Sequence, residues 1–281
     1  MVELAQGYKN KCVVFAGRGD LKDIAKNYGF THFLTLDDLA AAHPTAHPDS
    51  AGSLPAIDID LEDNTNIRVK QGLWSMPIAA LMVLNDPKDW SRDLQWCVDI
   101  LSSPAATGLS IASERGPLIE SGANFTPIYF SNSDLLWKAD WHRPRFGQAA
   151  FRLSLERLYE AYNGYKLEES HRITQFGKPF MSAYQFAQRQ LHLQAATLNL
   201  HQSASGREFE RIYMIGDNPA ADILGANKAG APWTSVLVRT GVFQSSDANC
   251  SDHPAQMVEA DLASAIHSIA EQEGWPRPTT F

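Results

Sequence analysis

Short apolar segments that alternate with helical segments are the feature that most restricts the fold of this chain. The runs Lys11–Ala16, Ile78–Leu84 and Arg211–Ile215 each end in a polar or glycine-containing turn, and a helical segment follows each turn. A strand that returns parallel to its neighbour needs a crossover connection, usually a helix. The alternation therefore predicts an α/β fold with a parallel, doubly wound sheet, whose functional groups collect at the carboxyl ends of the strands.

The remaining segments extend this pattern. Residues 43 to 55 are rich in proline and serine and predict a loop. The helix at Gly147–Tyr162 carries a predicted apolar face, formed by Phe151, Leu153, Leu155, Leu158 and Tyr159. The other predicted strands are His32–Leu34, Ile128–Phe130, Ile173–Phe176 and Ser235–Val238. The strand at His32–Leu34 leads into Asp37–Ala42. The other predicted helices are Leu21–Tyr28, Asp89–Leu101 and Asp261–Gln272, with two more that follow Pro179 and Pro219.

Length and composition limit what the chain binds. A length of 281 residues predicts two domains, or one domain with a large insertion. The net charge of -8 argues against a nucleic-acid or anionic-membrane partner, and the longest apolar run, Pro77–Leu84, is too short to span a bilayer. The 3 cysteines lack metal-ligand spacing, which predicts reduced thiols in an intracellular compartment and no zinc site. We expect a small substrate or a protein partner.

The segment Tyr213–Asp222 (YMIGDNPAAD) carries the clearest chemical signal. An apolar strand delivers Asp217 to the carboxyl edge of the sheet, Gly216 allows a tight turn, and Asp222 follows on the first turn of a helix. Two carboxylates that face one pocket suit Mg²⁺, which proteins usually hold with one or two carboxylates plus water and phosphate oxygens. The alternative is structural: Asp217 starts a turn and Asp222 complements the helix dipole.

The surrounding residues favour the functional interpretation. The stretch IYMIGDNPAADILGANKAG resembles the fourth motif of the haloacid-dehalogenase-like (HAD) hydrolases, in particular class IIA, and TQFGKPF places Lys178 where that family carries its third-motif lysine. Further stretches, among them GRGDLKDIAKNYGF and PIYFSNSDLLWKADWHRPRFGQAAF, resemble the cat-eye-syndrome critical-region branch of class IIA. Together the similar stretches cover nearly the whole chain.

The resemblance implies a HAD-like Rossmannoid core, of which residues 171 to 281 form the C-terminal half, and a large α/β cap at residues 1 to 170. It also implies a Mg²⁺-dependent phosphatase of a small phosphorylated metabolite, with Lys178 as a catalytic residue, Asp217 and Asp222 as metal residues, and Gly216 and Asn218 in the phosphate and metal shell. Members of the branch are largely mitochondrial, caps of this type often form homodimers, and a link to glycerophospholipid metabolism is a weak lead.

Smaller features carry alternatives. The turn at Asn132–Asp134 stands where relatives have Asn-Pro-Asp, and it is either a substrate-contacting turn or a structural Asx-turn. Gly17-Arg18-Gly19 predicts a plain turn, because Lys22 occupies the position at which a dinucleotide loop needs its third glycine. The tryptophans Trp74, Trp90, Trp96 and Trp137 are predicted to pack in the core or the cap.

The family mechanism needs a first motif, Asp-x-Asp-Gly, in which one aspartate is the nucleophile and the other an acid/base. The sequence contains no such motif; Asp58-Ile59-Asp60 is followed by Leu61 and does not end a long apolar strand. We therefore expect these residues alone to be inactive and the strand at 211 to 215 to have an unpaired edge. The explanations are a truncation, which we favour, a piece from another chain, or a non-catalytic binding or assembly protein.

Overall fold

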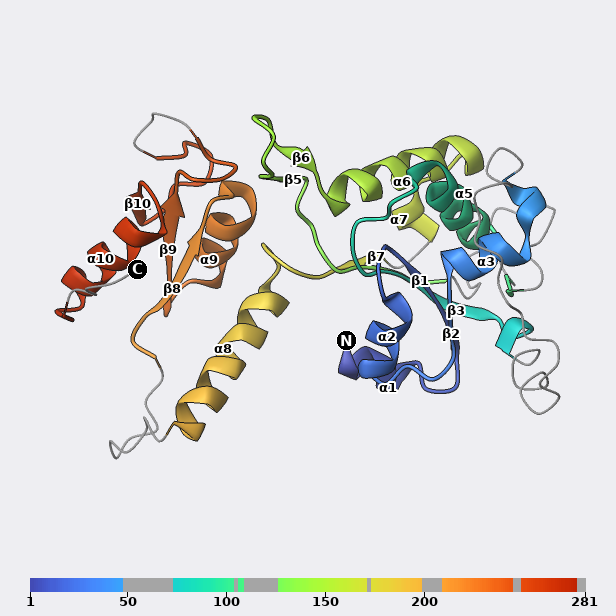
Figure 1. Cartoon of the computed structure of the whole chain (residues 1–281), viewed down its shortest axis with the longest axis horizontal. Coiled ribbons are helices and arrows are strands. Elements are labelled where there is room, and N and C mark those ends of the chain that lie inside the picture. The colour runs from blue at the N-terminus through green and yellow to red at the C-terminus, as the bar shows by residue number, and fades with distance from the viewer. Residues whose placement is uncertain are drawn as a thin grey trace. The chain divides into compact units, whose positions relative to one another are not determined.

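The computed structural model describes residues 1–47, 73–103, 106–108, 126–170, 173–198, 209–244 and 249–276. They divide into two compact units, residues 1–131 with 150–175 and residues 132–149 with 176–281 (Figure 1). The predicted fold class is confirmed, because both larger sheets are parallel and alternate with helices. The domain boundary expected after residue 170 stays a prediction; the division by contacts assigns residues 132–149 to the same unit as the C-terminal residues.

The first unit is built on a sheet of 5 parallel strands in the order β2-β1-β3-β4-β7. The order reverses between β1 and β3, which is the signature of a doubly wound sheet. The strands are β1 Cys12–Ala16, β2 Phe33–Thr35, β3 Ile78–Val83, β4 Ile128–Phe130 and β7 Ile173–Gln175. The helices are α1 Val2–Gly7, α2 Leu21–Asn27, α3 Leu36–Ala42, a short 3-10 helix at Pro44–Ala46, α5 Trp90–Leu101, α6 Gln148–Asn163 and α7 Leu167–Ser170.

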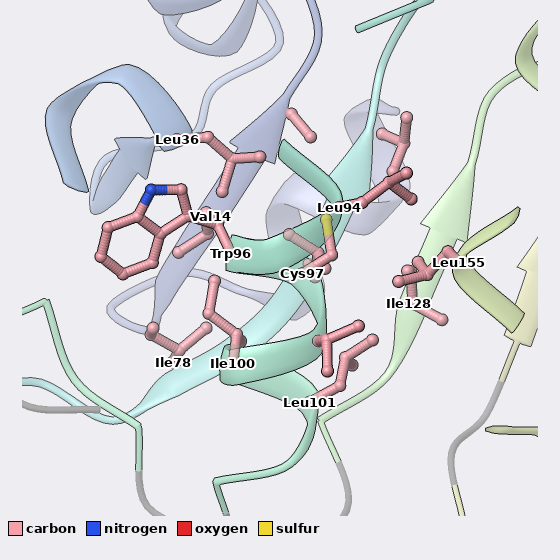
Figure 2. Packing of buried hydrophobic residues seen from close by; sticks show 14 of the residues in the cluster. Val14, Leu36, Ile78, Leu94, Trp96, Cys97, Ile100, Leu101, Ile128 and Leu155 are labelled. Atoms are coloured by element: carbon pink, nitrogen blue, oxygen red, sulfur yellow. The ribbon is translucent and has the colours of Figure 1, made fainter. Parts of the chain in front are cut away.

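This sheet is buried on both faces. Successive side chains of β1 alternate: Val14 packs with α3, α5 and α6, whereas Phe15 packs with α1 and α2. Figure 2 shows residues of α5, among them Trp96 and Cys97, packed against strand residues such as Ile128. Burial on both faces explains why β1 and β3 are apolar throughout, without the alternation of a half-exposed strand.

The apolar face of α6 is narrower than its sequence predicts. Phe151, Leu155 and Tyr159 are fully buried at a spacing of four residues, whereas Leu153 and Leu158 are 46% and 47% exposed. The prediction was wrong for these two leucines for different reasons: Leu153 lies on the opposite side of the helix from the buried row, whereas Leu158, three residues after Leu155, lies at the margin of that row and stays half exposed.

The second unit contains a sheet of 3 parallel strands in the order β10-β9-β8 and a separate antiparallel hairpin. Helices α8 and α9 pack on one face of the sheet and α10 on the other (Figure 1). The elements are the hairpin strands β5 Leu136–Trp137 and β6 Arg145–Phe146, then α8 Met181–Thr197, β8 Ile212–Gly216, a π-helical turn Pro219–Ile223, α9 Leu224–Ala229, β9 Trp233–Val238, β10 Met257–Glu259 and α10 Leu262–Gln272.

Strand β8 lies at an edge of its sheet in the described part of the chain, where its one pairing is with β9. Four of its five residues are only half-buried, in contrast to the largely buried β9. The unpaired edge expected from the sequence is therefore present among these residues. Within the same described ranges, no helix combines the length and the hydropathy that a membrane crossing requires.

Candidate functional site

Asp217 directly follows β8, and the loop after β9 closes around it. Its Oδ2 accepts a hydrogen bond of 2.6 Å from the Val242 amide, and its carbonyl oxygen accepts one of 2.9 Å from the Phe243 amide. A Cβ atom at Gly241 would overlap the Asp217 carboxylate, so position 241 requires glycine. One carboxylate oxygen of Asp217 is thus fixed by the backbone of a neighbouring loop.

Asp222 is the most deeply buried charge of the site, with a side chain only 3% exposed. Its Oδ2 accepts a hydrogen bond of 3.0 Å from the Asn218 amide, and its Oδ1 forms an ion pair of 2.5 Å with Lys178 Nζ. A Cβ atom at Gly216 would overlap this carboxylate, so the residue before Asp217 must be glycine. Asn218 in turn accepts a hydrogen bond of 3.2 Å from the Ala220 amide. Asp222 therefore holds both the turn and the lysine.

Lys178 stays charged despite its partial burial. Burial alone would lower the pKa of Lys178, but the hydrogen bond and charge of Asp222, with smaller contributions from Asp134 and Asp217, raise that pKa above 10.5. The ammonium group is therefore a permanent positive charge at neutral pH. Its side chain is 38% exposed, so the charge is accessible as well as fixed.

Tyr184 of α8 contacts the backbone of the same cluster. Its hydroxyl donates a hydrogen bond of 3.0 Å to the carbonyl oxygen of Asp222, and its ring occupies the space that a side chain at Gly225 would need. Burial raises the pKa of Tyr184, with a further contribution from the charge of Asp222, so the hydroxyl remains a donor. No sequence motif singles out this residue, which lies in an ordinary helical segment.

The turn at Asn132–Asp134 also belongs to this unit. The Asp134 amide donates a hydrogen bond of 2.9 Å to Asn132 Oδ1, which is the geometry of an Asx-turn. Ser133 Oγ donates a hydrogen bond to the carbonyl oxygen of Lys178. The turn is therefore attached to the lysine segment, and a role of Asn132 and Asp134 in substrate contact stays a prediction.

These groups line a cavity of about 520 Å³, within the range of small-molecule sites. All the predicted site residues except Asn132 belong to its wall. Further residues complete it, including Trp137, which was predicted to pack in the core or the cap but is 45% exposed. The lining residues are Asp134, Leu136, Trp137, Lys138, Lys178, Ile215, Gly216, Asp217, Asn218, Asp222, Val238, Thr240, Gly241, Val242 and Leu262.

The donor set fits a magnesium ion that is held mainly by ligands other than the protein. Both oxygens of Asp222 are engaged, whereas Asp217 Oδ1 accepts no hydrogen bond within the described ranges. The described residues contain no group of three or more histidine, cysteine or acidic side chains suited to a metal. Mg²⁺ commonly takes only one or two carboxylates and completes its shell with water and phosphate oxygens. Asp58 and Asp60 lie outside the described residues.

The sequence comparisons with known proteins agree with one another on the family. Residues 175–265 match the family model described as HAD-hydrolase-like. A mitochondrial hydrolase of Saccharomyces cerevisiae is 32% identical over 273 residues, which is 92% of this chain and 72% of the yeast protein. A cardiolipin synthase (CMP-forming)/mitochondrial hydrolase fusion protein of Schizosaccharomyces pombe is 31% identical over 242 residues, and the match spans 86% of this chain but 36% of the fusion protein.

Two solved structures are also similar. One, described as a possible sugar phosphatase of the HAD superfamily from Cytophaga hutchinsonii, has a TM-score of 0.35 and 17% identity, and the match covers 98% of this chain and 94% of that one. The other, a double mutant of a thermostable NPPase from Geobacillus stearothermophilus, has a TM-score of 0.34 and 12% identity, with coverage of 90% and 96%.

Proposed function

Because the chain belongs to the HAD-like hydrolase superfamily, we propose that it carries the metal- and phosphate-binding part of a Mg²⁺-dependent phosphomonoester hydrolase. The observation that supports this most directly is the arrangement of Lys178, Asp217 and Asp222 around one cavity. A fixed cation and a carboxylate with an available oxygen are the two groups that phosphate and Mg²⁺ need.

The three charged residues have separate roles in this proposal. Asp217 Oδ1 ligates the metal, which supplies charge neutralisation at the phosphoryl oxygens when it is bound. Lys178 binds the same phosphoryl group as a point charge. Asp222 is a positioning residue rather than a ligand, because both its oxygens already hold Lys178 and the Asn218 amide. This division follows the expectation that Asp217 ligates Mg²⁺ while Asp222, with Asn218, orients the metal shell.

The 281 residues contain no Asp-x-Asp-Gly motif, so the proposal assigns them binding without turnover. A phosphoryl group bound to Lys178 and Mg²⁺ has no aspartate nucleophile from the family's first motif within this sequence. The substrate is a small phosphorylated metabolite, in keeping with the cavity volume of about 520 Å³.

Calorimetry with inorganic phosphate and Mg²⁺ tests the site. We expect phosphate binding that requires Mg²⁺, that Asp217→Asn abolishes, and that Lys178→Met weakens at least tenfold, roughly the loss of one charge-assisted contact. Asp252→Asn is the matched control, because Asp252 is exposed and does not line the cavity. Absence of phosphate binding in the wild-type chain would contradict the site. Hydrolysis of p-nitrophenyl phosphate that Asp217→Asn abolishes would contradict the proposed lack of turnover.

A non-catalytic assembly protein is the second candidate. It is supported by the exposed apolar side chains Leu158 and Tyr162, which lie four residues apart on α6 in the predicted cap and are 47% and 43% exposed. Sedimentation velocity is expected to show a homodimer that Leu158→Glu dissociates. A monomeric wild-type chain would exclude the dimer.

We also propose a mitochondrial location, supported by the two relatives whose names place them in mitochondria. Fractionation of cells that express the tagged protein tests this location, and recovery outside mitochondria would contradict it. A role in glycerophospholipid metabolism stays a prediction.

A further inference from the structure

A hairpin forms one wall of the cavity. Its strands β5 and β6 pair through Leu136 with Phe146 and Trp137 with Arg145. The consecutive residues Leu136, Trp137 and Lys138 all line the cavity that contains Lys178 and Asp217. The hairpin therefore contributes directly to the space in which a phosphorylated ligand would lie.

The hairpin is held in place by its own hydrogen bonds. The Gly147 amide donates to the Leu135 carbonyl oxygen at 2.9 Å, and a Cβ at Gly147 would lie 2.5 Å from the carbonyl oxygen of Asp134. Trp137 Nε1 donates to the Phe146 carbonyl oxygen at 3.2 Å. The indole N–H is thus occupied, and the exposed part of Trp137 is ring surface without a hydrogen-bond donor.

The only charged residue of the hairpin that lines the cavity is also engaged. Lys138 Nζ donates to the carbonyl oxygens of Ala139 and Trp141 at 2.8 and 2.7 Å, so the ammonium group closes the turn of the hairpin. A ligand that approaches this wall meets an indole ring and neighbouring aliphatic side chains. The apolar residues of the cavity wall are Leu136, Trp137, Ile215, Val238, Val242 and Leu262.

We infer that the site takes phosphomonoesters whose leaving group is a planar aromatic ring, with the ring stacked on Trp137 and the phosphate at Lys178. This inference rests on the phosphate site proposed above. A flat ring recovers dispersion and quadrupole interactions with the indole face. The hydroxyl groups of a sugar or glycerol phosphate would lose water at the apolar wall without gaining partners there. The cavity thus combines a fixed positive charge at Lys178 with an exposed indole at Trp137, which matches an aryl or heteroaryl phosphate.

Binding of four probes to the 281-residue chain in the presence of Mg²⁺ tests this inference: inorganic phosphate, phenyl phosphate, cyclohexyl phosphate and glycerol 1-phosphate. We expect phenyl phosphate to bind about tenfold more tightly than cyclohexyl phosphate, which has a ring of similar size but no π face, with glycerol 1-phosphate weakest. Trp137→Leu is expected to remove this preference and to weaken the binding of phenyl phosphate far more than that of inorganic phosphate.

Two variants keep the test specific. Trp137→Phe retains an aromatic face and is expected to keep most of the preference for phenyl phosphate, although it loses the bond to Phe146. Trp141→Leu is the matched control, because Trp141 is 58% exposed on the same hairpin but does not line the cavity. Equal binding of phenyl and cyclohexyl phosphate, with inorganic phosphate still bound, would overturn the aromatic preference alone. Loss of binding for all four probes would overturn the phosphate site and the inference together.

Discussion

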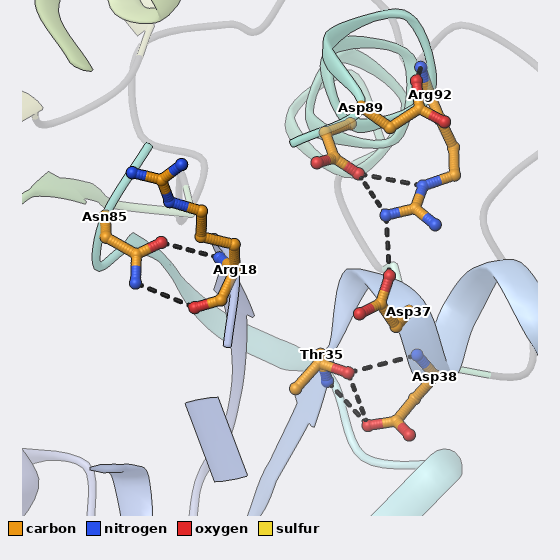
Figure 3. Close-up of polar contacts among 8 residues, drawn as sticks. Arg18, Thr35, Asp37, Asp38, Asn85, Asp89 and Arg92 are labelled. Carbon is orange, nitrogen blue, oxygen red and sulfur yellow. Dashed lines mark hydrogen bonds and ion pairs between the residues drawn. The ribbon is translucent and has the colours of Figure 1, made fainter. Parts of the chain in front are cut away.

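The two parallel sheets of this protein carry charged residues at the same place, the carboxyl ends of their strands, but the charges are used differently. In the first unit they pair with one another: Arg92 pairs with Asp37 at 2.7 Å (Figure 3), and Lys22 pairs with Asp38 at 2.6 Å. In the second unit Lys178, Asp217 and Asp222 line a cavity, and Asp217 keeps one oxygen available.

The position at which the strand order reverses in the first unit is also occupied by the protein itself. Asn85, which follows β3, accepts a hydrogen bond of 2.6 Å from the Arg18 amide and donates one of 2.9 Å to the Arg18 carbonyl oxygen (Figure 3). Ligands often bind at this position in doubly wound sheets. A charged residue at a strand end thus indicates a ligand-binding site only when two conditions hold. One of its polar atoms must remain available for the ligand, and a cavity must adjoin that atom.

Substitution of the glycines in the two turns is expected to give the largest loss of stability. Gly17 and Gly216 each make room for a polar side chain, Asn85 and Asp222 respectively. Gly216→Ala is expected to lower the free energy of unfolding by about 3 kcal/mol, the upper range for overpacking, and to abolish phosphate binding because Asp222 and Lys178 must move. Urea unfolding and calorimetry measure the two effects.

Gly17→Ala is the matched variant in the first unit. Gly17 has a φ of 144°, so alanine adds backbone strain to the overlap with Asn85. We expect a similar loss of stability with unchanged phosphate binding. A loss of phosphate binding in this variant would show that the turn after β1 also serves the site, and the contrast between the two sheets would fail.

The buried Asp93 predicts a pH dependence of stability in the first unit. Its side chain is 1% exposed, and burial raises its pKa to about 6 despite its ion pair with Arg92 at 2.8 Å. Folded Asp93 therefore binds a proton more readily than unfolded Asp93. The free energy of unfolding contributed by this residue falls as the pH rises from about 4 to above 6, by roughly 3 kcal/mol.

Comparison of the wild type with Asp93→Asn isolates this effect, because the other carboxyl groups titrate in both. Urea unfolding at pH 5 and pH 7 is expected to show that the wild type loses stability relative to the variant at the higher pH. A gain of wild-type stability relative to the variant at pH 7 would mean that the ion pair with Arg92 lowers the pKa of Asp93 more than burial raises it. Phosphate binding should be the same in both proteins, since Asp93 lies on α5 of the first unit, where the charged residues pair with one another.

The sequence predicted the strands of both sheets except β10, and it predicted the residues Lys178, Asp217 and Asp222, because apolar periodicity and local motifs carry that information. It did not predict that Asp222 pairs with Lys178, a contact across 44 positions that only folding creates. It also missed the hairpin, because strands of two residues are too short to show a period. The prediction that Trp137 packs in the core or the cap was wrong for the same reason: its segment shows no period that would separate a buried from an exposed position.

Substitutions in the ion pairs of the two units are expected to give the smallest changes in the free energy of unfolding. Asp222→Asn retains an acceptor for the Asn218 amide but removes the charge that holds Lys178. We expect a loss of about 1 kcal/mol in the free energy of unfolding, reduced by the partial exposure of Lys178. Asp38→Asn removes the partner of Lys22, whose side chain is 56% exposed, and is expected to cost less than about 0.5 kcal/mol.

The pH dependence separates these two pairs further. Because the pKa of Lys178 is raised above 10.5, the stability that it contributes is fully present below that pH and is lost as the pH rises through the raised value. Asp222→Asn should therefore lower the pKa of Lys178, measured by NMR titration of its Nζ, and should weaken phosphate binding at alkaline pH before the wild type weakens. An unchanged Lys178 pKa in Asp222→Asn would mean that Asp222 does not hold the lysine, and the second sheet would then differ from the first only in its cavity.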